Sequence, residues 1–159
     1  MRIPAGQAVA TPVTRVDFYI LGDDSDAQAA DTIACRLAGK AFGLGHAVYL
    51  HAASVEHAQR LDQLLWTFQQ GSFVPHVAAQ GWQPPVDGLP TPVLLGYDEP
   101  PEAEPWDLLI NTAGSVPLFF SRYARVAELV PGESAARQLG RERYQFYRER
   151  GYELHTHKL

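Results

Sequence analysis

The sequence predicts one α/β domain of three layers, helices on both faces of a mainly parallel sheet. Short runs of β-branched and aromatic residues alternate along the chain with helix-forming segments, which is typical of parallel strands joined by right-handed crossovers. The length of 159 residues fits a single domain with one core. The composition, 46% hydrophobic and 19% charged, excludes a disordered or low-complexity protein.

The N-terminal part begins with a mixture of Gly, Pro and small residues, which predicts a flexible leader at residues 1–15 and places the domain at 16–159. The run VDFYIL, residues 16–21, is almost wholly apolar and stops at Gly22, as a buried strand entering a turn does. Residues 25–42 are mostly Ala and other helix formers, with acidic residues early and basic residues late, and predict a helix.

The same cycle then repeats. Residues 46–51 (HAVYLH) predict a second strand, Ser54 is a candidate N-cap, and residues 55–68 place apolar side chains at helical spacing. The short extended segment 73–77 contains Pro75, which predicts an edge position in the sheet.

The last part of the chain starts with two Pro-rich polar stretches, 80–92 and 98–105, which predict surface connections on either side of a short apolar run at 93–97. The remaining elements are recognised by their apolar runs and by the closing Gly151. They are a strand at 107–111, a short helix at 117–123, a strand at 125–130 and a long helix at 134–150.

Charge is distributed unevenly. The net charge of -5 argues against a general nucleic-acid binder. Residues 1–119 hold 5 basic and 13 acidic groups, whereas residues 120–159 hold 8 basic and 5 acidic. No run is apolar enough for a membrane span or a secretory signal, so we expect a cytoplasmic protein.

Glycine-containing turns do not match a phosphate-binding site. The turn LGDDSD after the first strand has one Gly and three carboxylates, and a dianion would be repelled there. GKAFGLG follows a helix and suits a C-cap, GxxxxGK[ST] does not occur, and NTAG at 111–114 lacks the accompanying dehydrogenase motifs. The fold is therefore predicted to be Rossmann-like without a phosphate-binding loop, and no cofactor is assigned.

No catalytic or metal-binding set can be assembled from the sequence. Ser115 lacks the GxSxG elbow, and Cys35, the only cysteine, lies in a predicted helix where burial would raise its pKa. His155 and His157 would share a face of an extended tail, but no third metal ligand can be named. We therefore assign no catalytic residue and no metal site.

The C-terminal helix has a basic strip. At 100° per residue, Arg137, Arg141, Tyr144 and Arg148 share a sector about 60° wide, whereas Leu139 and Phe146 lie opposite and are predicted to face the core. The strip has two interpretations, a solvated face whose arginines pair with Glu142 and Glu149, or a binding site for an anionic partner. Trp66, on the second helix, is either a core aromatic or an anchor in a protein interface.

Several motifs in order resemble one family. VDFYIL, AQRLDQLLW, SFVPH and a strand ending in VP followed by ARQLGRERYQFYRERGYEL are similar to the chi subunit of the bacterial DNA polymerase III holoenzyme, over about residues 16 to 155. The resemblance implies a non-enzymatic adaptor of the clamp loader. Family members pair with the psi subunit and bind the acidic C-terminal tail of single-stranded DNA-binding protein, which ends in Pro-Phe.

The resemblance also implies which residues bind these partners. Val130, Arg137, Arg141, Tyr144 and Arg148 are expected to bind the tail, and Gln145, where the family often has a basic residue, predicts fewer ion pairs. Trp66 and Phe73 are expected to form the surface for psi or an alternative helicase partner. Two other functions remain open, a nucleotide-using enzyme on a Rossmann-like scaffold and direct binding of single-stranded DNA by the Arg/Tyr strip.

Overall fold

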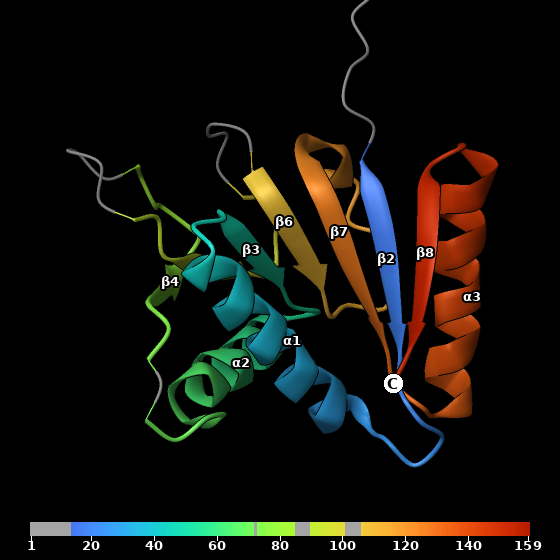
Figure 1. The fold of residues 1–159 in the computed structure, drawn as a ribbon, viewed down its shortest axis with the longest axis horizontal. Helices are drawn as coiled ribbons and strands as arrows, with labels where there is room; N and C mark the ends of the chain where they lie inside the picture. The colour runs from blue at the N-terminus through green and yellow to red at the C-terminus, as the bar shows by residue number, and fades with distance from the viewer. Residues whose placement is uncertain (1–13, 72, 85–89, 101–105) are drawn as a thin grey trace, which may run out of the picture.

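The computed structural model describes residues 14–71, 73–84, 90–100 and 106–159. These residues form a seven-stranded sheet in the order β4-β5-β3-β6-β7-β2-β8 (Figure 1), and every pairing in it is parallel. The strands are β2 (Arg15–Ile20), β3 (Val48–His51), β4 (His76–Ala78), β5 (Val93–Gly96), β6 (Trp106–Asn111), β7 (Tyr123–Val130) and β8 (Glu153–Lys158). The helices are α1 (Ala27–Gly43), α2 (Val55–Thr67), α3 (Ser134–Glu149) and the short 3-10 helix η1 (Phe120–Arg122).

Helices cover the two faces at different ends of the sheet. α1 and α2 lie in front of the sheet in Figure 1, whereas α3 runs along β8 at its right-hand edge. The strands alternate accordingly, since Val48 and Leu50 pack in the core beneath α1 and α2 while Tyr49 packs in the core that contains Tyr147 of α3. The predicted three-layer α/β fold with a parallel sheet is confirmed.

Capping side chains set the starts of the first two helices. The Asp26 carboxylate accepts a hydrogen bond from the Ala29 N–H at 2.9 Å, and the Ser54 hydroxyl accepts one from the His57 N–H at 3.1 Å. Both helices therefore begin within two residues of the predicted positions. Among the described residues, no helix is long and apolar enough to cross a membrane.

Two strands have no counterpart in the sequence prediction. The apolar run 93–97 forms β5, which lies between β4 and β3 with Val93 and Leu94 fully buried. The tail 153–158, whose residues are mostly polar, forms β8 at the opposite edge and pairs with β2 alone. The predicted leader lies largely outside the described residues, but Arg15 already belongs to β2.

A buried polar network fixes α3 to the sheet. Glu128 of β7 is fully buried, and its carboxylate accepts hydrogen bonds from the Arg143 Nε at 2.8 Å, the Tyr147 hydroxyl at 2.7 Å and the Asn111 amide at 2.9 Å. The Arg143 guanidinium also donates to the Leu129 and Gly114 carbonyls. Burial raises the pKa of Glu128, and the Arg143 charge opposes that rise.

This network also corrects the predicted orientation of α3. Leu139, placed on the core face by the periodicity, is 43% exposed, and Phe146 is only partly buried. The buried residues are Gly140, Arg143 and Tyr147. An arginine counts as a surface residue in any hydrophobic pattern, so the pattern misplaced the core face by about a quarter of a turn.

Candidate functional site

Four of the five residues expected to bind the tail surround one small cavity. Val130 at the end of β7 and Arg137, Arg141 and Tyr144 of α3 line a cavity of about 170 Å³ between the helix and the sheet. Its other lining residues are Phe18, Ile20, Gly140 and Thr156. Arg148 lies one turn beyond Tyr144 and is exposed, but it does not line the cavity.

The cavity has an apolar floor and exists partly because residue 140 is a glycine. Phe18, Ile20 and Val130 supply aliphatic and aromatic surface from β2 and β7. A Cβ at Gly140 would lie 2.9 Å from the Val130 Cγ1, so any side chain there would enter this contact. A cavity of about 150 Å³ accepts benzene, and this cavity is therefore large enough for a phenyl ring.

The arginines at the rim differ in what holds them. Arg137 is anchored, since its guanidinium lies 2.7 Å from the Asp23 carboxylate and donates to the Leu21 carbonyl at 2.9 Å. Arg141 is exposed, and among the described residues its guanidinium donates only to the neutral Gln138 side chain, at 2.8 Å. Arg141 therefore keeps its charge available to a ligand, whereas Arg137 is positioned beforehand.

The two glutamates of α3 do not pair with this strip. Glu142 and Glu149 accept hydrogen bonds from Gln138 and Gln145 respectively, and within the described residues neither forms an ion pair. The pairing of the strip's arginines with these glutamates, which the solvated-face interpretation expects, is therefore not formed among the described residues.

Trp66 and Phe73 form an exposed aromatic patch on the other side of the molecule. Their side chains are 55% and 59% exposed, and their ring centroids are 5.1 Å apart. The His76 ring lies behind them, 5.1 Å from Trp66. Of the two interpretations of Trp66, the structure excludes a core aromatic and leaves an exposed pair of large apolar rings, which is a common feature of protein interfaces.

Near the carboxyl ends of the parallel strands, where open α/β sheets usually bind ligands, the titratable side chains have structural partners. His57 lies 3.0 Å from both oxygens of Asp31, but its Nδ1 already accepts from the Ala53 N–H, so this pair joins α1 to α2. In the turn after β2, Asp23 pairs with Arg137 and Asp26 caps α1. Cys35 is fully buried, and burial raises its pKa to about 12.

The tail histidines each meet a carboxylate instead of one another. His155 contacts Glu153, and His157 lies 2.9 Å from Asp17, which is buried and also bound by Arg15 and Arg125. In the ranges that the structure describes, no three His, Cys, Asp or Glu side chains gather in a way that could hold a metal ion.

Sequence reasoning missed two parts of these surfaces. Gly140 was not predicted as a site residue because a glycine inside a helix gives no pattern. Its position opposite Val130, at the end of β7, is what indicates a close approach of the helix to the strand. A groove of about 920 Å³ beside α2 was also missed, because its walls come from three segments far apart in the chain.

These features define a Rossmann-like α/β domain in which the turn after the first strand holds carboxylates used for capping and pairing, not a phosphate-binding loop. The family model described as the DNA polymerase III chi subunit matches residues 13–155. The chain therefore belongs to the DNA polymerase III chi subunit family.

Individual relatives agree with this assignment. The chain is 44% identical to the DNA polymerase III subunit chi of Pseudomonas aeruginosa, with 92% of this chain and 98% of the relative covered. It is 32% identical to the subunit of the same name in Escherichia coli, over 87% and 94% of the two chains. The corresponding values for the Haemophilus influenzae subunit are 29%, 89% and 95%.

Proposed function

We propose that this chi-family chain is a non-catalytic adaptor of the DNA polymerase III clamp-loader assembly. It binds the acidic C-terminal tail of single-stranded DNA-binding protein with α3, and it binds psi, which attaches to the clamp loader, with the α2 side. The observation that carries the proposal is the apolar cavity of about 170 Å³ with Arg137 and Arg141 at its rim.

The chemistry of the tail matches this cavity. A terminal phenylalanine would place its ring against Phe18, Ile20 and Val130, and its free carboxylate would meet the Arg141 guanidinium. Arg148, one turn further along the helix, would attract the acidic residues that precede the Pro-Phe end. Gln145 is neutral and bonded to Glu149, so we expect it to add no ion pair.

The surroundings of Tyr144 favour a protein tail over single-stranded DNA as the ligand of this site. Its ring is only partly exposed and packs edge-on against Phe18, with centroids 5.3 Å apart and an interplanar angle of 61°. One side of the ring thus packs in the core. The residue therefore suits the wall of a cavity better than a surface on which bases stack. Weak binding of an unstructured oligonucleotide is therefore expected.

The second surface is the aromatic patch of Trp66 and Phe73. Two exposed aromatic rings in contact supply a large apolar area, with little conformational entropy to lose on binding. Psi is the partner proposed for this patch, and a helicase would compete for the same residues. The tail contact itself is weak and sensitive to salt, and it becomes effective because the DNA-binding protein is multimeric and locally concentrated.

A titration with tail peptides tests the proposal. We expect the peptide ending in Pro-Phe to bind the wild-type chain, and removal of the terminal Phe to abolish binding, because the cavity is then empty. Arg141→Ala should weaken the intact peptide about tenfold at low salt. Gln145→Ala, on the same helix, is the matched control and should change the affinity less than about twofold.

Three results would contradict the proposal. Equal binding of peptides with and without the terminal Phe would exclude the cavity as the site. Binding of an oligonucleotide more tightly than the peptide would favour the DNA-binding alternative. A rise in melting temperature with a nucleotide would instead support the enzyme alternative.

A further inference from the structure

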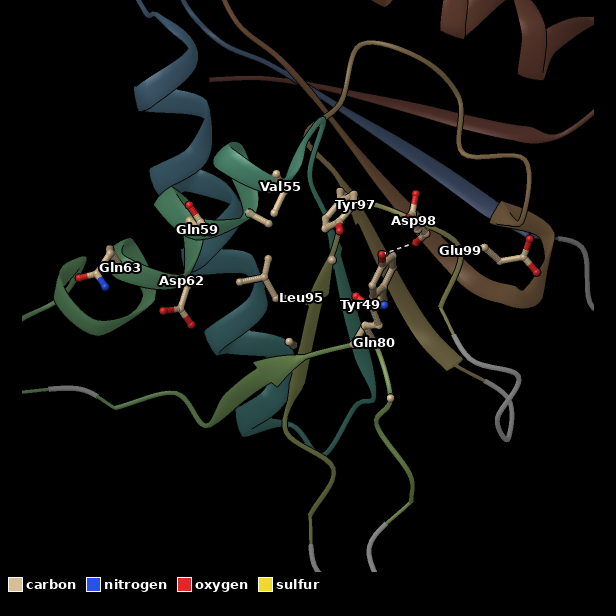
Figure 2. Close-up of a pocket in the computed structure, with 15 residues that line it drawn as sticks. Tyr49, Val55, Gln59, Asp62, Gln63, Gln80, Leu95, Tyr97, Asp98 and Glu99 are labelled. Atoms are coloured by element: carbon tan, nitrogen blue, oxygen red, sulfur yellow. Dashed lines mark hydrogen bonds between the residues drawn. The ribbon is translucent and has the colours of Figure 1, made fainter.

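A large groove lies at the carboxyl ends of β4 and β5, against α2. Its volume is about 920 Å³, within the range of sites that hold a ligand or a peptide segment of several residues. One wall is a single face of α2, from Val55 to Gln63. The opposite wall is formed by residues 78–81, from the last residue of β4 onward, and by residues 95–99, from the end of β5 onward (Figure 2).

The groove is acidic. Asp62, Asp98 and Glu99 line it, and none of its lining residues in the described part of the chain is basic. Glu99 is neutralised by Arg122, and Asp62 lies 3.2 Å from the His76 Nε2. Asp98 forms no ion pair with any described residue. The groove therefore has unneutralised negative charge, which favours a cationic occupant and repels phosphates.

The position of Asp98 is fixed by the strand beneath it. The Tyr49 hydroxyl donates a hydrogen bond to the Asp98 carbonyl at 2.5 Å, as Figure 2 shows. Burial raises the pKa of Tyr49, so this hydroxyl stays protonated and remains a donor. A Cβ at Gly96 would lie 2.7 Å from the same hydroxyl, so the floor is closely packed at this point. The backbone that carries the Asp98 side chain is therefore anchored to β3.

The groove and the aromatic patch form one continuous surface. Asp62 and Trp66 are one turn apart on α2, and the His76 ring bridges them, with its Nε2 beside Asp62 and its ring 5.1 Å from Trp66. A protein that packs on Trp66 and Phe73 can therefore also contact the opening of the groove.

We infer that the partner that packs on Trp66 and Phe73 inserts a segment bearing an arginine or lysine side chain into this groove, where the cation pairs with the Asp98 carboxylate. The inference rests on the proposed function, because it names what the partner at the aromatic patch must carry. Apolar rings supply the main contact, and the acidic groove selects a partner with a basic segment and steers its approach.

Titration of the full chain with psi at low and at moderate salt tests the inference. We expect Asp98→Asn to weaken binding about fivefold at low salt and Asp98→Lys at least about thirtyfold, and both effects to shrink as salt rises. Glu142→Lys makes the same change of charge at an exposed position of α3, and it should alter the affinity less than about twofold. Asp98 is exposed, so these variants should fold as the wild type does.

A parallel titration of Trp66→Ala distinguishes failure of the groove inference from failure of the docking proposal. If Trp66→Ala abolishes psi binding and Asp98→Lys binds as the wild type does, the groove inference is overturned and the docking proposal stands. If Trp66→Ala binds psi normally, the docking proposal fails and the groove inference fails with it. Equal weakening by Asp98→Lys and Glu142→Lys would also overturn the inference, because the effect would then be general electrostatics.

Discussion

The α3 end of the sheet and the α2 end carry opposite charges and recessed sites of different size. The cavity beside α3 is small, has an apolar floor and has arginines at its rim, whereas the groove beside α2 is several times larger and lined by carboxylates. The cavity is lined from β2, β7 and β8, and the groove from β3, β4 and β5, so they lie near opposite edges of the same sheet, whose strand order Figure 1 shows. On our proposal, one small domain thus presents two separate surfaces of opposite charge to two different partners.

The two ends also differ in how their helices are attached. α1 and α2 pack on the sheet mainly through aliphatic side chains, while α3 depends on the buried Glu128, Arg143, Tyr147 and Asn111 network as well. A buried charged pair is costly to break because the remaining charge has no partner. The α3 surface is therefore expected to be the more sensitive of the two to a single interior substitution.

The largest predicted effect comes from Arg143→Ala. It leaves the Glu128 carboxylate buried without its charged partner and should lower the free energy of unfolding by about 3 to 5 kcal/mol, as measured by urea denaturation. Arg148→Ala, exposed on the same helix, should change it by less than about 0.5 kcal/mol.

A milder variant keeps this prediction testable if Arg143→Ala does not fold. Tyr147→Phe removes one hydrogen bond to Glu128 and should cost about 1 to 2 kcal/mol. Where the variant remains folded, tail binding should weaken and psi binding should not. Loss of both activities in equal measure would contradict the separation of the two ends.

The second prediction concerns acid stability at the groove end. His51 is 8% exposed beside Phe119, and burial lowers its pKa to about 4. The Asp98 charge opposes this lowering of the pKa, and the His57 charge adds to it. In the unfolded chain the His51 side chain takes up a proton near pH 6.5. Above that pH, the stability contributed by the neutral, buried imidazole is therefore fully present. Between pH 6.5 and pH 4 the wild type should lose about 3 kcal/mol through this group.

His51→Leu should remove that loss, because leucine does not titrate. Unfolding curves at pH 7, 5.5 and 4 for both proteins measure the difference. Asp17 at the α3 end behaves differently. Burial alone would raise its pKa, but hydrogen bonds from His157, Arg15 and Arg125 lower it, so its contribution is lost only as the pH falls below about 4. If the free energies of unfolding of His51→Leu and the wild type depend on pH in the same way above pH 4, the loss of stability does not come from His51.

The smallest predicted effect is that of Gly140→Ala on tail binding. The added Cβ would lie 2.9 and 3.1 Å from the two Val130 methyl groups, so it narrows the cavity or moves α3 outward. We expect tail-peptide affinity to fall about fivefold and psi affinity to stay unchanged. A tail affinity equal to that of the wild type would show that the cavity does not hold the terminal residue.

The sequence predicted the fold well where local signals are strong. Asp26 and Ser54 cap helices that begin close to the predicted positions, and the apolar runs at 16–21 and 107–111 became buried strands. β8 was not recognised because its residues are mostly polar and it is a strand only through its pairing with β2. β5 was not recognised because its four residues lie between Pro-rich stretches.

The site residues, too, could be predicted where the signal lies within one segment of the chain. The basic strip of α3 could be found because residues of one helix obey one period. The core face of that helix could not, since Arg143 is buried only through its partners on other strands. The groove beside α2 depends on three separate segments, and no pattern within a single segment records it.

A ternary titration tests whether one chain holds both proposed partners at once. The affinity of the tail peptide should be measured for the free chain and for the chain saturated with psi. We predict a 1:1:1 complex in which the two affinities for the peptide agree within about twofold, since the two surfaces lie near opposite edges of the sheet and share no residue. Displacement of the peptide by psi would contradict it.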